Sequence, residues 1–180
     1  MADWRNFYLQ KMGMTSGNPY PLKESVSSWG VWCSEIPFVI YGKTKDIAKR
    51  TWPDEHGDDE YIPSGGACLE AYTMKVKFGC KKMNTMADGN TSISAVSDVR
   101  KNVGKFLEYL RSSGMMMMYS SHTRIGRQYV RLQDVSENAK WKSKDGQEFL
   151  VFEVTFKVND PMTDVKIVNN HLVIDSSSSD

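Results

Sequence analysis

The chain has 180 residues, enough to bury the core of one domain but too few for two well-formed ones. Its 23 basic residues nearly balance its 22 acidic residues, which excludes a global field that would draw the protein onto nucleic acid or an anionic membrane. The three cysteines form no CxxC pair, and no apolar run approaches the roughly 20 residues that span a bilayer. We expect a soluble protein made in a reducing cytoplasm, without a signal peptide.

Residues 1–30 mix aromatic residues with glycine, proline and serine and show no sustained period, which predicts an irregular N-terminal arm. A single domain is expected over residues 31–174, followed by a disordered serine-rich tail at 175–180. Within residues 30–41, β-branched and aromatic side chains indicate a strand. Pro37 makes it a broken strand or an edge strand, because proline cannot donate to a ladder.

Residues 69–78 alternate between apolar and polar side chains, which predicts a half-buried antiparallel strand. Its apolar face would carry Tyr72, Met74, Val76 and Phe78. In residues 97–112, apolar residues recur at helical spacing, and this period predicts a helix of about four turns. The apolar residues in question are Val99, Val103, Phe106, Leu107 and Leu110.

The rest of the chain has the character of β-strands. Strands are expected at 115–119, 128–135 and 149–158, with a bulge at Phe152-Glu153 where the alternation changes phase. A short final strand is expected either at 165–168 or at 172–174. Together these elements predict a mainly β fold, an antiparallel β-sandwich or small barrel of six to seven strands with one flanking α-helix and long loops.

The segment RTWPDEHGDDEY, residues 50–61, concentrates carboxylates and one histidine. A calcium loop of the EF-hand type would need Gly57 at its sixth position, and Trp52 would then stand where the first oxygen ligand belongs. An ion site of lower specificity, built from its aspartates, remains an alternative. A charge run between proline and glycine is nevertheless more typical of a solvated turn.

We interpret this acidic loop as a contact surface whose carboxylates are solvated or pair with arginines of a neighbouring subunit. Trp52, Pro53 and Tyr61 are expected to anchor it. The residues assigned to the interaction are Trp52, Asp54, Glu55, Asp58, Asp59, Glu60 and Tyr61 in the loop and Arg127 and Arg131 further along the chain.

No other constellation favours a reaction. The cysteines and histidines lack the ligand spacing of a zinc site, so buried or half-buried thiols are the simpler interpretation. Ser121 and His122 have no glycine elbow and, as neighbours on a strand, would point to opposite faces. Glycine-rich phosphate loops of the GxxxxGK[ST] or GxGxxG type do not occur. We therefore expect no enzyme activity, no cofactor and no metal.

Two further patterns leave alternatives open. At strand spacing, Arg127, Tyr129 and Arg131 would share a face, which is typical of a small platform for nucleic acid. A solvated sheet face or an intersubunit salt-bridge row is the competing interpretation, and the balanced net charge favours it. The run Met115–Met118 is expected in the core, with a contact surface as the alternative.

The order of elements resembles the fold of tail proteins of long-tailed bacteriophages: an arm and a strand, a long loop, a strand pair, one helix and closing strands. Residues 149–161 (FLVFEVTFKVNDP) are similar to the closing strand of the distal tail protein family, which runs into an Asp-Pro turn. That family also has one helix followed by strands. The corresponding positions here are the helix at 97–112, then Tyr119 and RQYVRL at 127–132.

This resemblance implies a non-enzymatic subunit that forms a ring, usually a hexamer, as a distal tail, baseplate or tail tube component. Its partners would be further copies and other tail proteins, with DNA only as cargo through the channel, and the protein would reside in the virion tail after assembly in the host cytoplasm. The loop 43–66 would contact the next ring, while the arm 1–30 and the edge near 31–40 would pair with neighbours.

Three alternatives remain. Because no second domain follows Pro161, a tail terminator or a head–tail completion protein is the first. The second belongs to another class, a carbohydrate-binding β-sandwich module that would hold a sugar on Trp29, Trp32 and Trp52. A metal-dependent enzyme comes third.

Overall fold

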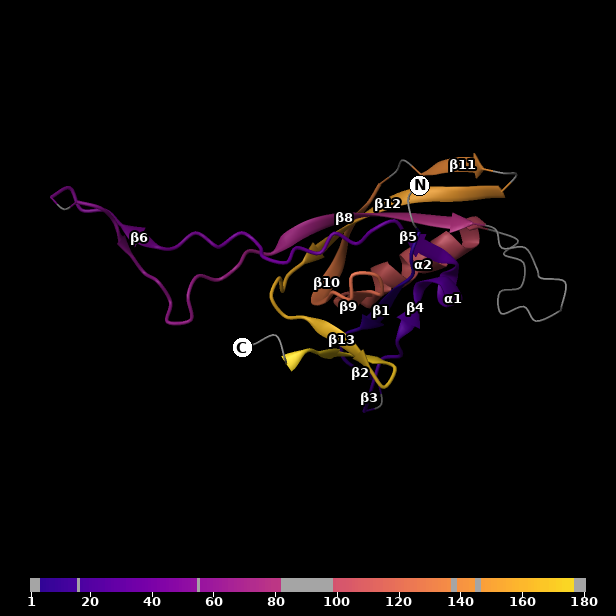
Figure 1. Cartoon of the computed structure of the whole chain (residues 1–180), viewed down its shortest axis with the longest axis horizontal. Coiled ribbons are helices and arrows are strands. Elements are labelled where there is room, and N and C mark those ends of the chain that lie inside the picture. Colours follow the sequence, from indigo (N-terminus) through magenta and orange to yellow (C-terminus); the bar gives the residue numbers. More distant parts are fainter. Residues whose placement is uncertain are drawn as a thin grey trace.

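The computed structural model describes residues 4–15, 17–54, 56–81, 99–136, 139–144 and 147–176. One antiparallel sheet dominates the fold and curls around a long helix (Figure 1). β11 (Lys140–Lys144) belongs to this sheet but lies off its main strand order, because among the described strands it pairs only with the one at Gln147–Val158. The other strands are, in spatial order, β4 (Lys23–Glu24), β1 (Phe7–Lys11), β9 (Met116–Ser120), β10 (Gly126–Val135), β12 (Gln147–Val158), β8 (Tyr72–Lys81) and β5 (Val31–Cys33). The prediction of a mainly β fold with one flanking helix is thereby confirmed.

The two ends of the curled sheet meet at one bridge. Arg5 and Cys33 exchange two backbone hydrogen bonds, from Arg5 N–H to the Cys33 carbonyl (2.8 Å) and from Cys33 N–H to the Arg5 carbonyl (2.9 Å). On the same edge, β1 then pairs with β4, which starts at residue 23. The sheet is therefore an incompletely closed barrel. At Cys33 the β5 edge is already paired within the chain, so this residue does not offer its backbone to a neighbour, while pairing of the rest of the edge at 31–40 stays a prediction.

Helix α2 (Val99–Ser113) fills the inside of the curl. It buries four apolar side chains at helical spacing: Val99, Val103, Phe106 and Leu110. The Phe106 ring lies at the centre, with its centroid 5.3 Å from that of Phe78 and 6.0 Å from that of Phe7. Gly114 follows with φ of +62°, the left-handed conformation that ends a helix at little cost in glycine. The predicted helix is confirmed over 99–112, and residues 97 and 98 lie outside the described residues.

The alternation predicted for β8 and for the methionine run is confirmed. In β8 the side chains of Met74, Val76 and Phe78 are buried, whereas the lysines between them are exposed. In β9, Met116 and Met118 are fully buried, so this part of the run belongs to the core rather than to a contact surface.

The N-terminal segment differs from the irregular arm that the sequence predicts. β1 lies within the main sheet, and its Phe7 and Leu9 are fully buried. α1 (Ser25–Trp29) places the Trp29 ring against Phe106, with centroids 5.4 Å apart. The prediction is wrong here because β1 is only five residues long and is held by β9, more than a hundred residues away in sequence.

The bulge predicted at Phe152-Glu153 is also wrong. β12 pairs with β8 without interruption, from Phe149 opposite Lys81 to Val158 opposite Tyr72. Leu150, Phe152, Val154, Phe156 and Val158 continue a single alternation toward the core. The apparent phase change arises because Phe149 and Val151 give the other face apolar residues as well. The register shifts lie in β10 instead.

Both candidate C-terminal strands form, as the hairpin β13 (Val165–Val168) and β14 (His171–Ile174). The hairpin lies close to the main sheet at Gly126, where an added Cβ would be 2.5 Å from Val165 Cγ2. On its other strand, the Leu172 N–H donates to Oε1 of the buried Gln10 at 2.5 Å. These contacts attach the hairpin to β10 and β1.

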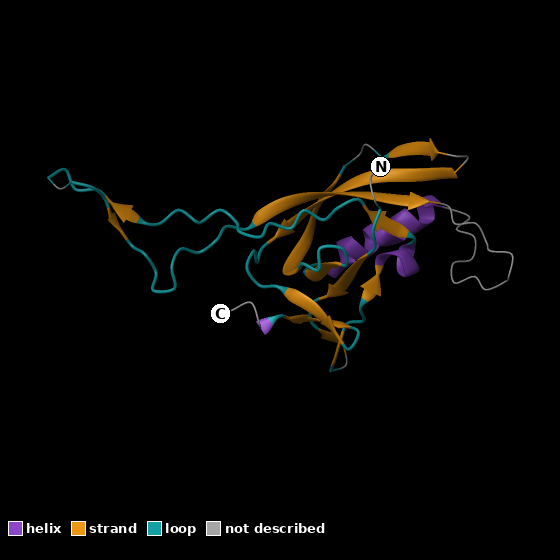
Figure 2. Ribbon diagram, in the orientation of Figure 1, coloured by secondary structure: helices purple, strands orange, loops and turns teal. Residues whose placement is uncertain are grey.

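Between β5 and β8 the chain leaves this body. Residues 40–70, which we call the projection, extend far beyond the sheet as a long ribbon (Figures 1 and 2). Its described residues form two short strands, β6 (Lys49–Arg50) and β7 (Asp59–Glu60). A further small pair, β2 (Met14–Thr15) with β3 (Asn18–Pro19), lies outside the projection. Within the described residues, the helices are too short or too polar to cross a membrane.

Candidate interaction surface

The two halves of the projection are held together by a sparse backbone ladder. Near the body, Glu70 N–H donates to the Lys43 carbonyl and Lys45 N–H donates to the Cys68 carbonyl, both at 2.7 Å. Further out, Tyr61 N–H donates to the Ala48 carbonyl at 2.9 Å, next to the two residue pairs of β6 and β7. The projection thus has a defined course but no core of its own.

The tip of the projection, residues 49–61, is organised by charge. Lys49 Nζ lies 2.9 Å from Asp58 Oδ2, and the Thr51 hydroxyl donates to Asp58 Oδ1 at 2.7 Å. The hydrogen bond from Lys49 holds the pKa of the Asp58 carboxyl below its usual range, and the same contact raises the pKa of Lys49. The Arg50 guanidinium lies 5.0 Å from the centroid of the Trp52 ring.

Large apolar and aromatic side chains stand in solvent along the projection. The exposed fractions are 79% for Ile40, 75% for Tyr41, 73% for Tyr61, 60% for Ile62 and 43% for Trp52. The predicted anchoring of the loop by Trp52, Pro53 and Tyr61 is therefore wrong, since all three are exposed and no core lies beneath them. Clustered exposure of such residues is the usual mark of a binding surface.

The carboxylates assigned to this loop are exposed wherever the structure describes them. Asp54, Asp58, Asp59 and Glu60 are all exposed, and Glu55 lies outside the described residues. In the ladder, Asp59 stands opposite Arg50 and Glu60 opposite Lys49. The tip therefore presents acidic side chains whose charge is offset in part by two basic neighbours.

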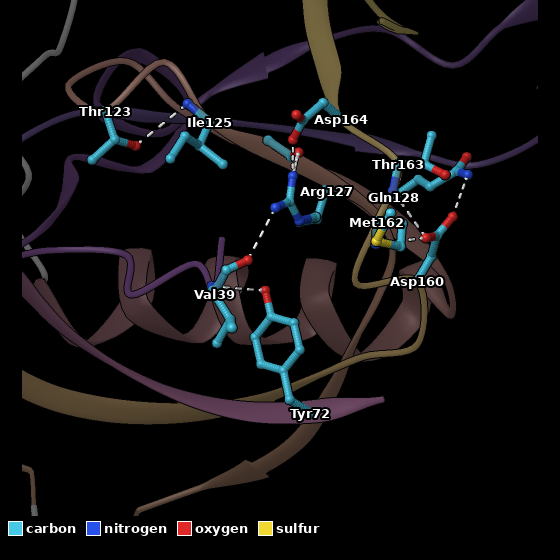
Figure 3. A network of polar contacts seen from close by, with 11 residues as sticks. Val39, Tyr72, Thr123, Ile125, Arg127, Gln128, Asp160, Met162, Thr163 and Asp164 are labelled. Carbon is cyan, nitrogen blue, oxygen red and sulfur yellow. Dashed lines mark hydrogen bonds and ion pairs between the residues drawn. The ribbon is translucent and has the colours of Figure 1, made fainter. Parts of the chain in front are cut away.

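The root of the projection is fixed by a buried arginine (Figure 3). Arg127 is 3% exposed, and its Nη2 donates to the Val39 carbonyl at 3.0 Å, one residue before the projection starts. Its Nη1 forms an ion pair with Asp164 Oδ1, at the start of the C-terminal hairpin. From the other side, Val39 N–H donates to the Tyr72 hydroxyl at 3.2 Å. Arg127 thus ties the root to both β10 and the hairpin.

The predicted face shared by Arg127, Tyr129 and Arg131 does not exist. Arg127 is buried, whereas Tyr129 is exposed and has φ of +51°. The β9–β10 register shifts between Arg127 and Val130, and this irregularity breaks the alternation of side chains. The half-buried Arg131 donates from Nη1 to the Leu132 carbonyl at 3.2 Å. The structure therefore does not bring these two arginines together with the acidic loop.

A carboxylate next to this network shapes the turn into the C-terminal hairpin (Figure 3). Asp160 Oδ1 accepts from the N–H groups of Met162 (3.1 Å) and Thr163 (3.0 Å), and Oδ2 accepts from Gln128 Nε2 (2.7 Å). Burial raises the pKa of Asp160, but the hydrogen bonds outweigh it and bring the pKa below its usual range.

Reactive groups stay apart in the described part of the chain. No three His, Cys, Asp or Glu side chains gather there as metal ligands would. The Ser121 hydroxyl donates to the Asn6 carbonyl at 2.7 Å, not to His122. Burial raises the pKa of Cys33 to about 12 and that of Cys80 to about 11, which keeps these thiols protonated and inert. Cys68 is exposed, so the prediction of buried or half-buried thiols holds for two of the three.

A second surface feature is a hollow of about 950 Å³ beside the start of β1. Its lining comes from segments 4–8, 24–27 and 121–124 and from Trp32. Sequence reasoning missed it because these segments lie far apart in the chain and share no local motif. Its volume is within the range of sites that accept several side chains or a small ligand.

The polar lining of this hollow is predominantly basic. Nη1 of Arg5 donates to Nδ1 of His122 at 2.6 Å. Arg124 is exposed at the same wall. Among the described lining residues the only carboxylate is that of Glu24, which accepts from Ser27 N–H at 2.6 Å and caps α1. Burial raises the pKa of Glu24, but its hydrogen bonds, first those with Ser27, outweigh burial and bring the pKa below its usual range.

Comparison of this chain with protein-family models, with curated proteins and with solved structures finds no match.

Proposed function

We propose that the protein is a non-enzymatic structural subunit of a bacteriophage tail that assembles with copies of itself into a ring, as a distal tail, baseplate or tail tube component. The observation that carries the proposal is the projection. This ribbon of about thirty residues has no core and leaves five large apolar or aromatic side chains in solvent. Exposed apolar surface of this kind is stabilised when a second protein surface covers it.

The fold supplies the second support. A curled antiparallel sheet with one helix, and a long excursion between an early strand and a central one, agrees with the long loop, the single helix and the closing strands of the resemblance to tail proteins, although the N-terminal arm of that resemblance is part of the sheet. If the projection of one copy binds a different surface on the body of the next copy, the contact between them is heterologous. Repeated contacts of this kind close into rings or continue as stacks.

The alternative of a carbohydrate-binding module loses support at its aromatic residues. Trp29 is 7% exposed and packs on Phe106, so it cannot stack on a sugar. Trp32 is half-buried and has the Lys81 ammonium 5.3 Å from its ring centroid. Of the three tryptophans, only Trp52 is well exposed, and it lies on the projection.

The test is self-association of the full chain by light scattering and electron microscopy over a range of concentrations. Replacing Tyr61 and Ile62 together with serine is expected to raise the concentration needed for assembly at least tenfold, because burying such side chains is worth about 1.5–3 kcal/mol each. Ile174→Ser is the matched control, since Ile174 is 55% exposed on β14 against 60% for Ile62. A strict monomer at all concentrations would refute the proposal.

A further inference from the structure

The hollow and the tip of the projection have complementary charge. Between Lys49 and Glu60 the chain carries five acidic residues against two basic ones, a net charge of −3. The lining of the hollow includes Arg5 and Arg124, and the Lys81 ammonium lies 5.3 Å from the centroid of the Trp32 ring. The carboxylate of Glu24 is already engaged by backbone N–H groups of α1. The charge of the acidic tip is therefore opposite to that of the hollow, where cations outnumber carboxylates among the described lining residues.

The two surfaces also match in aromatic content. Trp4, Tyr8 and Trp32 line the hollow, while Trp52 and Tyr61 stand exposed on the tip. Aromatic residues with a few charged partners are the usual composition of the centre of a protein interface.

One wall of the hollow is fixed in place by the sheet. The Trp4 ring lies so close to Gly79 of β8 that an added Cβ would be 2.9 Å from the ring. On the neighbouring strand, Trp32 stands opposite Gly79 in the β5–β8 register. The absence of a side chain at Gly79 is what admits the indole, so this wall is formed before any partner binds.

The tip does not reach the hollow of its own chain. The projection leads away from the body, and its tip lies at the far end of the molecule (Figure 1). A tip in a hollow would therefore join two molecules.

We propose that the hollow receives the tip of the projection, residues 49–61, from a second copy of this chain. This inference rests on the proposed function, because it names the surface that the projection contacts. Arg5 and Arg124 would face the tip carboxylates, and Trp4 and Tyr8 would cover its aromatic residues. Exposed ion pairs contribute little affinity individually, so the charges set register and association rate while the aromatic contacts supply most of the affinity.

The test is a charge-reversal cycle in the full chain. Asp54→Lys on the tip and Arg124→Glu in the hollow are each expected to weaken self-association about tenfold. A chain carrying both changes, or an equal mixture of the two single variants, is expected to return to within about threefold of the wild type, because opposite charges face each other again. Lys105→Glu on α2 and Asp134→Lys on β10 are matched exposed controls and should leave self-association unchanged.

A photo-crosslinking side chain at position 52 identifies the contact directly. The expected intermolecular products join position 52 to peptides from segments 4–8 or 121–124. Crosslinks to another surface, or single variants without effect, would overturn this inference while leaving the proposed function intact. A wild-type chain that never self-associates would overturn both. Binding of a single-stranded DNA oligonucleotide that Arg124→Glu abolishes, with self-association unchanged, would assign the hollow to nucleic acid and also overturn it.

Discussion

In the body, β8 and β12 pair over ten consecutive residues, and their inward side chains are buried against α2. In the projection, β6 and β7 pair over two residues, and the side chains of the tip are exposed. Burial fixes the body, whereas a sparse ladder and a few contacts at the root direct the projection. The difference teaches that one chain can hold regions of very different local stability, and that the less stable region is the one available for binding.

The largest expected effect comes from the centre of the body. Phe106→Ala should lower the free energy of unfolding by about 3–5 kcal/mol, because it removes a fully buried ring and leaves a cavity. Tyr61→Ala in the projection should change it by no more than about 0.5 kcal/mol. Urea denaturation of both variants measures the contrast, and similar losses would show that the projection contributes to the folded core.

The next-largest effect is expected from replacing Arg127, the buried arginine at the root of the projection. Arg127→Met deletes the hydrogen bond to the Val39 carbonyl and the ion pair with Asp164, for an expected loss of about 1.5–3 kcal/mol. Amide hydrogen exchange should rise in residues 36–45 while β8 keeps its protection. Arg131→Met is the control, since its one described contact is with the neighbouring Leu132 carbonyl. Equal exchange in the two variants would remove Arg127 from the role of fixing the root.

Two glycines in the body should respond in opposite directions. Gly126→Ala should cost about 1–3 kcal/mol, since the new methyl group meets Val165, Tyr119 and the Met118 carbonyl. Gly104→Ala, on the exposed face of α2 with no atom within 4 Å of the added Cβ, should gain about 1 kcal/mol. Thermal unfolding distinguishes the two, and a stabilised Gly126→Ala variant would contradict the close approach of the hairpin.

The smallest expected effect depends on pH. The pKa of Asp160 is lowered in the folded state, so its contribution to stability is present above the ordinary aspartate pKa of about 3.9 and is lost as pH falls through the folded pKa. Asp160→Asn should therefore lose less stability on acidification from about pH 5 to pH 2 than the wild type does. The pKa of Asp58 is lowered as well, but Asp58 lies in the exposed tip, so Asp58→Asn should differ from the wild type in the same direction and by less; chemical denaturation at several pH values tests both.

The regular parts of the body could be predicted because each carries its own period. β8 alternates with period two, and α2 repeats every 3.6 residues, so local sequence decides both. β1 could not be predicted in the same way, since its five residues owe their conformation to β9. The irregularity at Tyr129 likewise depends on pairing with neighbouring strands and leaves no sign in a segment that otherwise alternates.

In the candidate site, too, features that depend on local sequence could be predicted, whereas features that depend on long-range contacts could not. The acidic and aromatic character of the tip is visible in a single segment, and its exposure followed from the prolines and glycines around it. The burial of Arg127 depends on Val39 and Asp164, which come from two other parts of the chain. Long-range contacts of this kind have no local signature, and the hollow has none for the same reason.

The pairing of β1 with β9 also sets an order of events during folding. Phe7 pairs opposite Ser120, so more than a hundred residues must be synthesised after β1 before its partner exists. Contacts this distant in sequence are slow to form because the loop between them must close first. At synthesis rates of about 5–20 residues per second, β1 remains without β9 for several seconds. During that time Phe7 and Leu9 are apolar surface rather than core, and this interval is when the new chain is most vulnerable to aggregation.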